Sequence, residues 1–182
     1  KEGQATTTGY MLFKRFNRSI SKTSPGVASQ NRPSIIFRLA DFYLIYAEVA
    51  NEVNPSDSRV LTYLNLVRER AGLPKVEILN PGIVGNKELQ RAAIQRERQI
   101  ELATEGQRYF DVRRWMIADK DGEGRQNGYA HGMNVRGTIN DTEEFNRVVE
   151  TEKIVFNRKM YLQPIPDHEM RKTQNLVQNP GW

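Results

Sequence analysis

The stretch QRERQIELATEGQRYFDVRRW, from Gln95 to Trp115, carries the densest charge in the chain and runs directly into its tightest aromatic cluster. On a helix, its residues Glu97, Glu101 and Glu105 fall one turn apart and form a glutamate ladder. Because like charges four residues apart destabilise an isolated helix, we expect this ladder to have cationic partners. The expected partners are arginines nearby in the sequence or in the preceding helix: Arg68, Arg70, Arg108, Arg113 and Arg114.

The same stretch predicts two consecutive helices. Gly106 lies between them, where a residue in the left-handed conformation can end a helix. The first helix is expected to carry an apolar face with Arg96 in its middle, formed by Leu89, Ala92, Ala93, Ile100 and Ala103. Large apolar side chains favour a short second helix: Tyr109, Phe110, Val112, Trp115 and Met116.

The glutamate ladder has two interpretations. In the functional one, paired carboxylates perform acid–base chemistry, as in a glycosidase, or bind a metal. In the structural one, Glu97, Glu101 and Glu105 form ion pairs between packed helices. We favour the structural interpretation, because nearby positive charge disfavours a carboxylic acid that must hold its proton. On that interpretation further residues of the stretch also hold the fold: Arg108, Arg113, Arg114 and Trp115.

Three ordered motifs carry a resemblance to a known family. ERQIELATEGQRYFDVRRW (97–115) is similar to the signature of the SusD/RagB family, and RLADFYLIYAEVAN (38–51) resembles one of its helices. YLQPIPDHEM (161–170) and NLVQNPGW (175–182) resemble the family's C-terminal ending. The sequence departs from the pattern at Lys172-Thr173-Gln174-Asn175, where the family has Asn-Pro-Asn, and this puts the local turn in question.

The resemblance implies a mainly α, SusD-like helical fold with a tetratricopeptide-like helix pair, long loops and a minor β element. It also implies that residues 1–182 are the C-terminal portion of a longer domain. The chain opens on Lys1 without a signal peptide, so we expect the N-terminal repeat portion and the lipoprotein signal to be absent.

Composition limits the possible functions. The chain has 182 residues, no cysteine, and no apolar run near the ~20 residues that span a membrane. Its net charge of +5 is concentrated in the first 38 residues, which carry seven Lys and Arg against one Glu. A basic segment of this kind is usually a solvated surface, so we do not expect a nucleic-acid partner.

The remaining pattern is mainly helical. Apolar residues on both sides of Arg38–Glu52 predict a helix buried on two faces, with Phe42 and Tyr46 on one side and Ile45 and Val49 on the other. A second helix is expected from an N-cap at Ser56 to about Ala71, which completes a helix pair. Asn86 is expected to cap the helix of the glutamate ladder, over about 87–105.

Candidate ligand-binding residues lie in a long segment, Ala118–Asn140, that is predicted to be irregular. This segment contains one aromatic ring, which could stack on the C–H face of a sugar, and several side chains that could form hydrogen bonds with sugar hydroxyl groups. The alternative is a disordered surface loop. A short strand is expected at Tyr10–Phe16 as a second choice of site. The candidate ligand-binding residues are Tyr129, His131, Asn134, Arg136 and Tyr10.

The C-terminal part is expected to contain a helical turn over Thr142–Glu150, a strand within Lys153–Leu162 and a helix over His168–Lys172 capped by Asp167. His131 and His168 each lack a second ligand at metal spacing, so no metal site and no cofactor are expected. No nucleotide-binding or nucleophile motif is present either.

Function therefore rests on the resemblance. It implies non-enzymatic, cell-surface binding of oligosaccharides, or of another nutrient such as a peptide, on the outer face of a Bacteroidetes-type outer membrane. The implied partner is a SusC-like TonB-dependent transporter, and the implied attachment is a lipid anchor. Two alternatives stay open: a glycoside hydrolase that uses Glu97, Glu101 or Glu105, and a structural helical-repeat scaffold that binds only a partner protein.

Overall fold

The computed structural model describes residues 12, 14, 34–120, 128–133 and 148–182. The chain divides into two compact units, one formed by residues 33–111 and one formed by residues 1–32 and 112–182. The expected strand at Tyr10–Phe16 therefore lies almost wholly outside the described residues.

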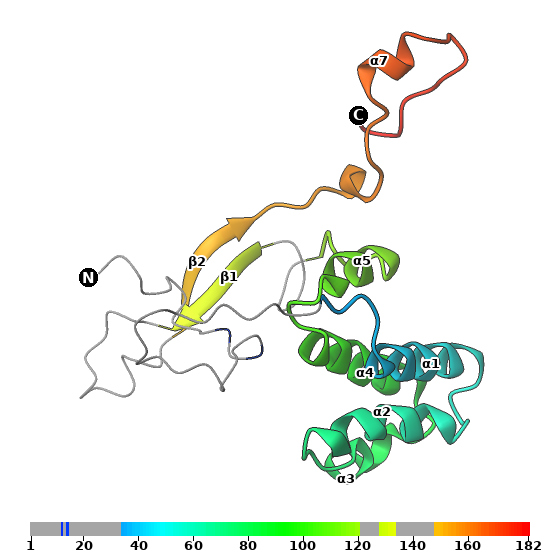
Figure 1. Ribbon diagram of the computed structural model, residues 1–182, viewed down its shortest axis with the longest axis vertical. Helices are drawn as coiled ribbons and strands as arrows, with labels where there is room; N and C mark the ends of the chain where they lie inside the picture. Colours follow the sequence, from blue (N-terminus) through cyan, green and yellow to red (C-terminus); the bar gives the residue numbers. More distant parts are fainter. Residues whose placement is uncertain (1–11, 13, 15–33, 121–127, 134–147) are drawn as a thin grey trace. The chain divides into compact units, whose positions relative to one another are not determined.

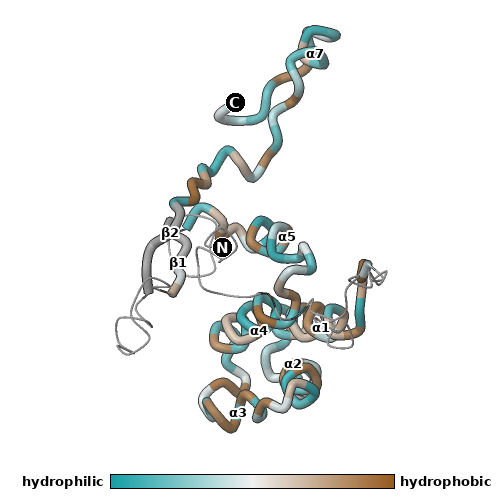
Figure 2. Tube along the Cα trace, turned by 60° about the vertical axis from the view of Figure 1, so that its left-hand side comes forward, coloured by the Kyte–Doolittle hydropathy of each residue, from teal (hydrophilic) through white to brown (hydrophobic). Residues whose placement is uncertain are grey.

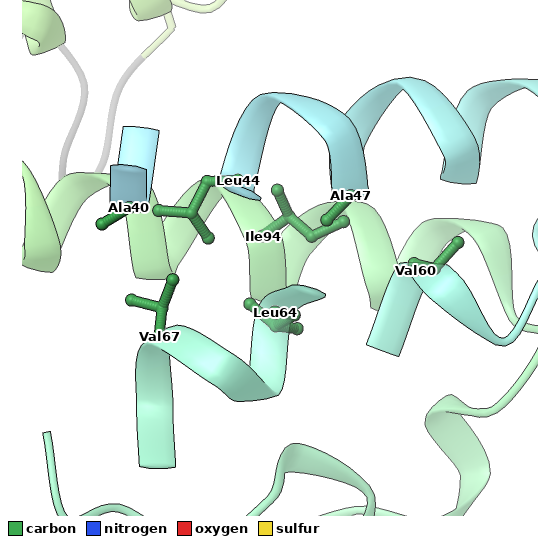
Figure 3. Close-up of a cluster of buried hydrophobic side chains, with 7 residues drawn as sticks. All are labelled: Ala40, Leu44, Ala47, Val60, Leu64, Val67 and Ile94. Atoms are coloured by element: carbon green, nitrogen blue, oxygen red, sulfur yellow. The ribbon is translucent and has the colours of Figure 1, made fainter. Parts of the chain in front are cut away.

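The unit of residues 33–111 is built from helices, which makes the chain mainly α as predicted. Helix α1 (Leu39–Val53) packs against α2 (Arg59–Arg70) and against α4 (Lys87–Glu101), and the three lie side by side (Figure 1). The core between them is one cluster of buried aliphatic side chains (Figure 3), formed by Ala40, Leu44, Ala47, Val60, Leu64, Val67 and Ile94. Their spacing of three and four residues along α1 and α2 is what directs them to one side of each helix.

Only one side of α1 is buried within the described residues, so the prediction of a helix covered on both faces is wrong here. Leu44 and Ala47 are fully buried, because α2 and α4 cover their side of the helix. On the other sides, Phe42, Val49 and Val53 are 57%, 58% and 81% exposed. An apolar surface of this kind on a helix normally packs against another part of a protein.

Helix α2 begins at Arg59, two residues later than the predicted N-cap at Ser56 implies. Its N-cap position is Ser58, and the carboxylate of Asp57 accepts a hydrogen bond from the backbone N–H of Arg59 at 2.9 Å. The helix ends at Arg70, and Gly72 then adopts a positive φ of 76°, which a glycine reaches without steric cost.

Two short helices, α3 (Val76–Leu79) and the 3-10 helix η2 (Pro81–Ile83), connect α2 to α4. Figure 2 shows α3 as mostly hydrophobic. Nevertheless, Ile78 and Leu79 are 67% and 65% exposed. The described unit thus carries a second apolar surface in addition to that of α1.

Helix α4 is capped as predicted, because the side chain of Asn86 accepts a hydrogen bond from the backbone N–H of Leu89 at 3.1 Å. The helix ends at Glu101, four residues earlier than expected. A turn with Thr104 and Gly106 at positive φ, 68° and 83°, leads into α5 (Gln107–Arg114). Gly106 thus has the left-handed conformation that was predicted. However, it ends the turn after α4 and not α4 itself.

The other unit contains an antiparallel hairpin of β1 (Gly128–Met133) and β2 (Val148–Ile154). The prediction that Ala118–Asn140 is irregular throughout is therefore wrong at 128–133, where pairing with a distant strand overrides a weak local pattern. Likewise, the helical turn expected over Thr142–Glu150 is wrong at its described end, since Val148–Glu150 belongs to β2.

After β2 the chain forms the 3-10 helix η3 (Arg158–Tyr161) and the short helix α7 (Asp167–Met170). The strand expected within Lys153–Leu162 is thus present only at its start. Helix α7 is one residue out of the predicted register: Pro166 holds the N-cap position and Asp167 is the first helical residue. A small core of Val112, Ala118 and Phe156 joins α5 to this C-terminal part.

Candidate functional site

Two glutamates of the ladder, Glu97 and Glu101, lie on the side of α4 that packs against other elements, whereas Glu105 lies in the turn after the helix and not on it as predicted. Glu97 accepts a hydrogen bond from Arg68 of α2 at 2.8 Å, and only 6% of its side chain is exposed. Arg70, also from α2, binds Glu101 at 2.6 Å. Two of the arginines predicted from the sequence are therefore partners of the ladder.

A partner that sequence reasoning missed is Arg38, the residue before α1. Its guanidinium donates to Glu101 at 2.5 Å and to Glu105 at 2.7 Å, and also to the backbone carbonyl of Glu101 at 2.6 Å. Partial burial opposes the charge on Arg38, but its hydrogen bonds to Glu105 and Glu101 raise its pKa above the ordinary value. Arg38 thus connects the start of α1 to both Glu101 and Glu105.

The most buried ion pairs of the unit are centred on Arg98. Its guanidinium donates to Asp41 of α1 at 2.9 Å and to both carboxylate oxygens of Asp111 in α5, at 3.0 and 3.1 Å. The three side chains are 2%, 5% and 3% exposed. These are charge-assisted hydrogen bonds with the fork geometry that arginine provides, and they join three helices.

A buried amide pair lies at the other end of α4. Gln90 donates to the side-chain carbonyl of Asn51 at 3.0 Å and to the backbone carbonyl of Pro55 at 2.8 Å. Asn51 in turn donates to the backbone carbonyl of Lys87 at 3.0 Å. Every buried side-chain nitrogen or oxygen of the described residues has such a partner.

The apolar face predicted for α4 is not the face that packs. Leu89 and Ile100 are 40% and 59% exposed, and the expected central residue, Arg96, is exposed as well. The buried residues are Gln90, Ile94, Glu97 and Arg98. The prediction failed because polar side chains with partners on other helices, Gln90, Glu97 and Arg98, share the buried face of this helix with Ile94.

The remaining residues assigned a structural role lie in and after α5. Arg108 is half-buried near the start of this helix. The guanidinium of Arg113 lies 5.0 Å from the centre of the Phe156 ring, and that of Arg114 lies 4.8 Å from the centre of the Trp115 ring. Their expected contact with the glutamate ladder stays a prediction.

The structure places two of the candidate ligand-binding residues on one strand. Tyr129 and His131 belong to β1, where they are opposite Lys153 and Glu150 of β2 in the register of the hairpin. Tyr10, Asn134 and Arg136 lie outside the described residues. The expected ligand contacts of all five therefore remain a prediction.

The next two observations concern the described residues alone. Among them, no three His, Cys, Asp or Glu side chains are placed to hold a metal ion. Within the same ranges, no helix is long and apolar enough to cross a lipid bilayer. The glutamates of the ladder are hydrogen-bonded to arginines, an arrangement that suits a structural cluster better than a proton donor.

The chain has a helical unit with a buried arginine–carboxylate cluster, and the stretch Gln95–Trp115 supplies part of this cluster. Sequence comparison identifies the family in which this stretch occurs. The sequence profile of the SusD family matches residues 1–182. The chain therefore belongs to the SusD family.

Individual relatives agree with this assignment. SusD-like protein P25 of Formosa agariphila is 44% identical over 106 residues, which are 58% of this chain and 19% of that protein. SusD-like protein P2 of the same organism is 31% identical over 153 residues, 81% of this chain and 26% of that protein. This chain thus spans about a fifth to a quarter of the length of these relatives.

Solved structures show the same fold. A SusD-like protein from Bacteroides fragilis superposes with a TM-score of 0.65 at 31% identity, over 82% of this chain and 26% of that chain. The helical architecture expected from the resemblance is therefore confirmed.

Proposed function

We propose that the protein binds oligosaccharides without chemical turnover. The observation that carries this proposal is the match of the whole chain to the SusD family, whose members generally act as glycan-binding proteins. The structure supports it in one respect: the three carboxylates considered for catalysis, Glu97, Glu101 and Glu105, are each hydrogen-bonded to an arginine. Binding would rest on ring stacking and hydrogen bonds to sugar hydroxyl groups.

The proposed setting is the outer face of the outer membrane of a Bacteroidetes-type bacterium. There the protein, held by a lipid anchor, would deliver its oligosaccharide to a SusC-like TonB-dependent transporter. This part of the proposal rests on family membership alone. It also includes the interpretation that residues 1–182 form the C-terminal portion of a longer SusD-like domain, which is consistent with the share of each relative that the chain covers.

The proposed ligand contacts lie around β1. Tyr129 would provide the stacking ring, and His131, Asn134 and Arg136 would provide donors and acceptors, with Tyr10 as a further candidate. Loops and hairpins carried on a helical scaffold are where binding residues tend to gather. By contrast, Glu97 and Arg98 of α4 are used in contacts with other helices.

The substitution Tyr129→Ala tests these contacts. Loss of a stacking ring is worth ~1–3 kcal/mol in comparable base-stacking sites, so affinity for the oligosaccharide should fall about tenfold. Titration calorimetry of the full-length protein would measure the affinity, and thermal melting would check that the fold is intact. Unchanged affinity would place the site in another part of the protein, while loss of both affinity and fold would assign Tyr129 to packing.

A structural scaffold is the second candidate function, because α1 and α3 expose apolar side chains that suit a protein partner. A glycan array separates the two candidates. A scaffold would bind no oligosaccharide on the array, and a nutrient-binding protein would bind at least one class.

A further inference from the structure

Helix α1 carries an exposed apolar stripe in addition to the side that packs in the core. The exposed stripe consists of five side chains, each at least 39% exposed: Leu39, Phe42, Tyr46, Val49 and Val53. They follow one another at intervals of three, four, three and four residues, which places all five within a narrow arc of the helix surface. The core residues Ala40, Leu44 and Ala47 lie on the opposite side of the helix (Figure 3).

Neighbouring rings extend and support the exposed stripe. The ring of Phe37 is 69% exposed, and its centre lies 6.2 Å from that of Phe42, so it continues the stripe beyond the start of α1. In the middle, the Tyr46 ring contacts the Tyr63 ring of α2, with centres 4.5 Å apart. The guanidinium of Arg59 lies 5.7 Å from the centre of the Tyr46 ring. Contacts with α2 thus hold the central ring of the stripe in place.

The spacing of the exposed stripe indicates which kind of element fits it. Alternating intervals of three and four residues are typical of a helix that packs along another helix, at a crossing angle of about 20°. Helix α1 has 15 residues, so at about 1.5 Å per residue the stripe is about 20 Å long. A second helix of about four turns, with an apolar stripe of its own, would cover it.

The described residues do not supply this second helix. Within them α1 packs against α2 and α4, which both contact its core side. The chain spans about a fifth to a quarter of the length of its SusD-like relatives. On the proposed interpretation that residues 1–182 are the C-terminal portion of a longer domain, most of that mainly helical domain precedes Lys1.

We propose that an amphipathic helix from the portion of the protein that precedes Lys1 packs along the exposed stripe of α1. This inference rests on the interpretation of the chain as a C-terminal portion, which is part of the proposed function. It adds the face by which that portion meets the helical unit of residues 33–111, and the kind of element that fills it. It also removes the exposed stripe from the surfaces open to a partner protein, on which the scaffold candidate partly rests.

The first test measures whether the exposed stripe is covered in the full-length protein. Val49→Cys places a thiol on the stripe of α1, and Thr62→Cys places one at an exposed position of α2. Thr62 is the matched control, because both parent residues are β-branched and lie within a helix, and the 182 residues contain no cysteine of their own.

A covering helix should make the thiol of Val49→Cys react with a maleimide at least ~tenfold more slowly than that of Thr62→Cys in the native protein, since reaction then requires local opening. In urea the two thiols should react at the same rate. Equal rates in the native protein would show an uncovered stripe and would overturn the inference.

The second test identifies what covers the exposed stripe. Phe42→p-benzoylphenylalanine keeps an aromatic ring in the stripe and, on irradiation of the full-length protein, crosslinks it to whatever lies against it. We expect a crosslink within one molecule to a peptide that precedes Lys1 and whose apolar residues recur at intervals of three and four. A product of two copies, a crosslink to another protein, or a crosslink to a peptide within residues 1–182 would each overturn the inference.

Glycan affinity, measured by titration calorimetry on the parent protein, keeps the inference separate from the proposed function. An uncovered stripe, or one covered by another molecule, would overturn the inference and leave glycan binding in place. Absence of binding to any glycan, together with the expected crosslink, would overturn glycan binding and support the inference.

Discussion

At the scale of single residues, Arg98 holds three helices together. Its hydrogen bonds to Asp41 and Asp111 satisfy three side chains that are almost completely buried. Replacing Arg98 by Met keeps the volume but leaves two buried carboxylates without their cation. Breaking a buried ion pair in this way costs about 3–5 kcal/mol.

The expected result for Arg98→Met is therefore a fall of that size in the free energy of unfolding, measured by urea denaturation of the full-length protein. Arg96→Met, on the exposed side of the same helix, is the control and should change stability by less than ~0.5 kcal/mol. Equal effects of the two substitutions would mean that the Arg98 cluster does not stabilise the fold.

A second residue prediction concerns acid stability. Two hydrogen bonds from Arg91, at 2.6 and 2.7 Å, lower the pKa of Glu52 from 4.5 to about 2, against the opposing effect of burial and with help from Lys87. Since the pKa is lower in the folded state, the ionised carboxylate stabilises the fold fully above pH 4.5. This contribution is lost as the pH falls from there through about 2.

The variant Glu52→Gln should therefore melt at a lower temperature than the parent at neutral pH. The difference should shrink as the pH falls from 4.5 towards 2, which a series of thermal melts would show. A difference that is constant over this range would contradict the ion-pair explanation.

Some of these ion pairs could be predicted from the sequence. Three glutamates one turn apart on one helix demand cations, and that local fact predicted Arg68 and Arg70. It could not predict Arg38 or the pairing of Arg98 with Asp41, because these partners are 63 and 57 residues apart in the sequence. Only the packing of α1 on α4 brings them together.

At the scale of elements, the N-cap of α4 decides where this helix begins. The Asn86 side chain accepts a hydrogen bond from one of the backbone N–H groups that have no partner within the helix. Asn86→Ala should lower the free energy of unfolding by about 1 kcal/mol, and Asn86→Asp should retain the parental value. Chemical denaturation measures both, and an Asn86→Ala variant as stable as the parent would show that the cap is dispensable.

Capping chemistry is local, which is why the start of α4 could be predicted from the sequence. The strand β1 could not be predicted, because its partner β2 follows only after residues 134–147 and the two strands meet only in the folded chain. Similarly, the sequence of α1 has apolar residues on every side of the helix, so it could not predict which side is buried. In the structure Leu44 is buried and Val49 is exposed.

At the scale of the whole molecule, the exposed apolar side chains of α1 and α3 point to further packing. If residues 1–182 are the C-terminal portion of a longer domain, as proposed, the rest of that domain would cover part of this surface. The isolated chain should then melt at a lower temperature than the full-length protein. Calorimetric scans of both would test this, and equal melting temperatures would contradict the proposal.

The central claim is that the protein binds an oligosaccharide without cleaving it. Titration of the full-length protein with a panel of oligosaccharides, followed by an assay for new reducing ends in the same samples, tests it most directly. We expect saturable binding with no increase in reducing ends over time. Reducing ends that accumulate with the parent protein and disappear in the variant Glu97→Gln would contradict it and would identify a glycosidase.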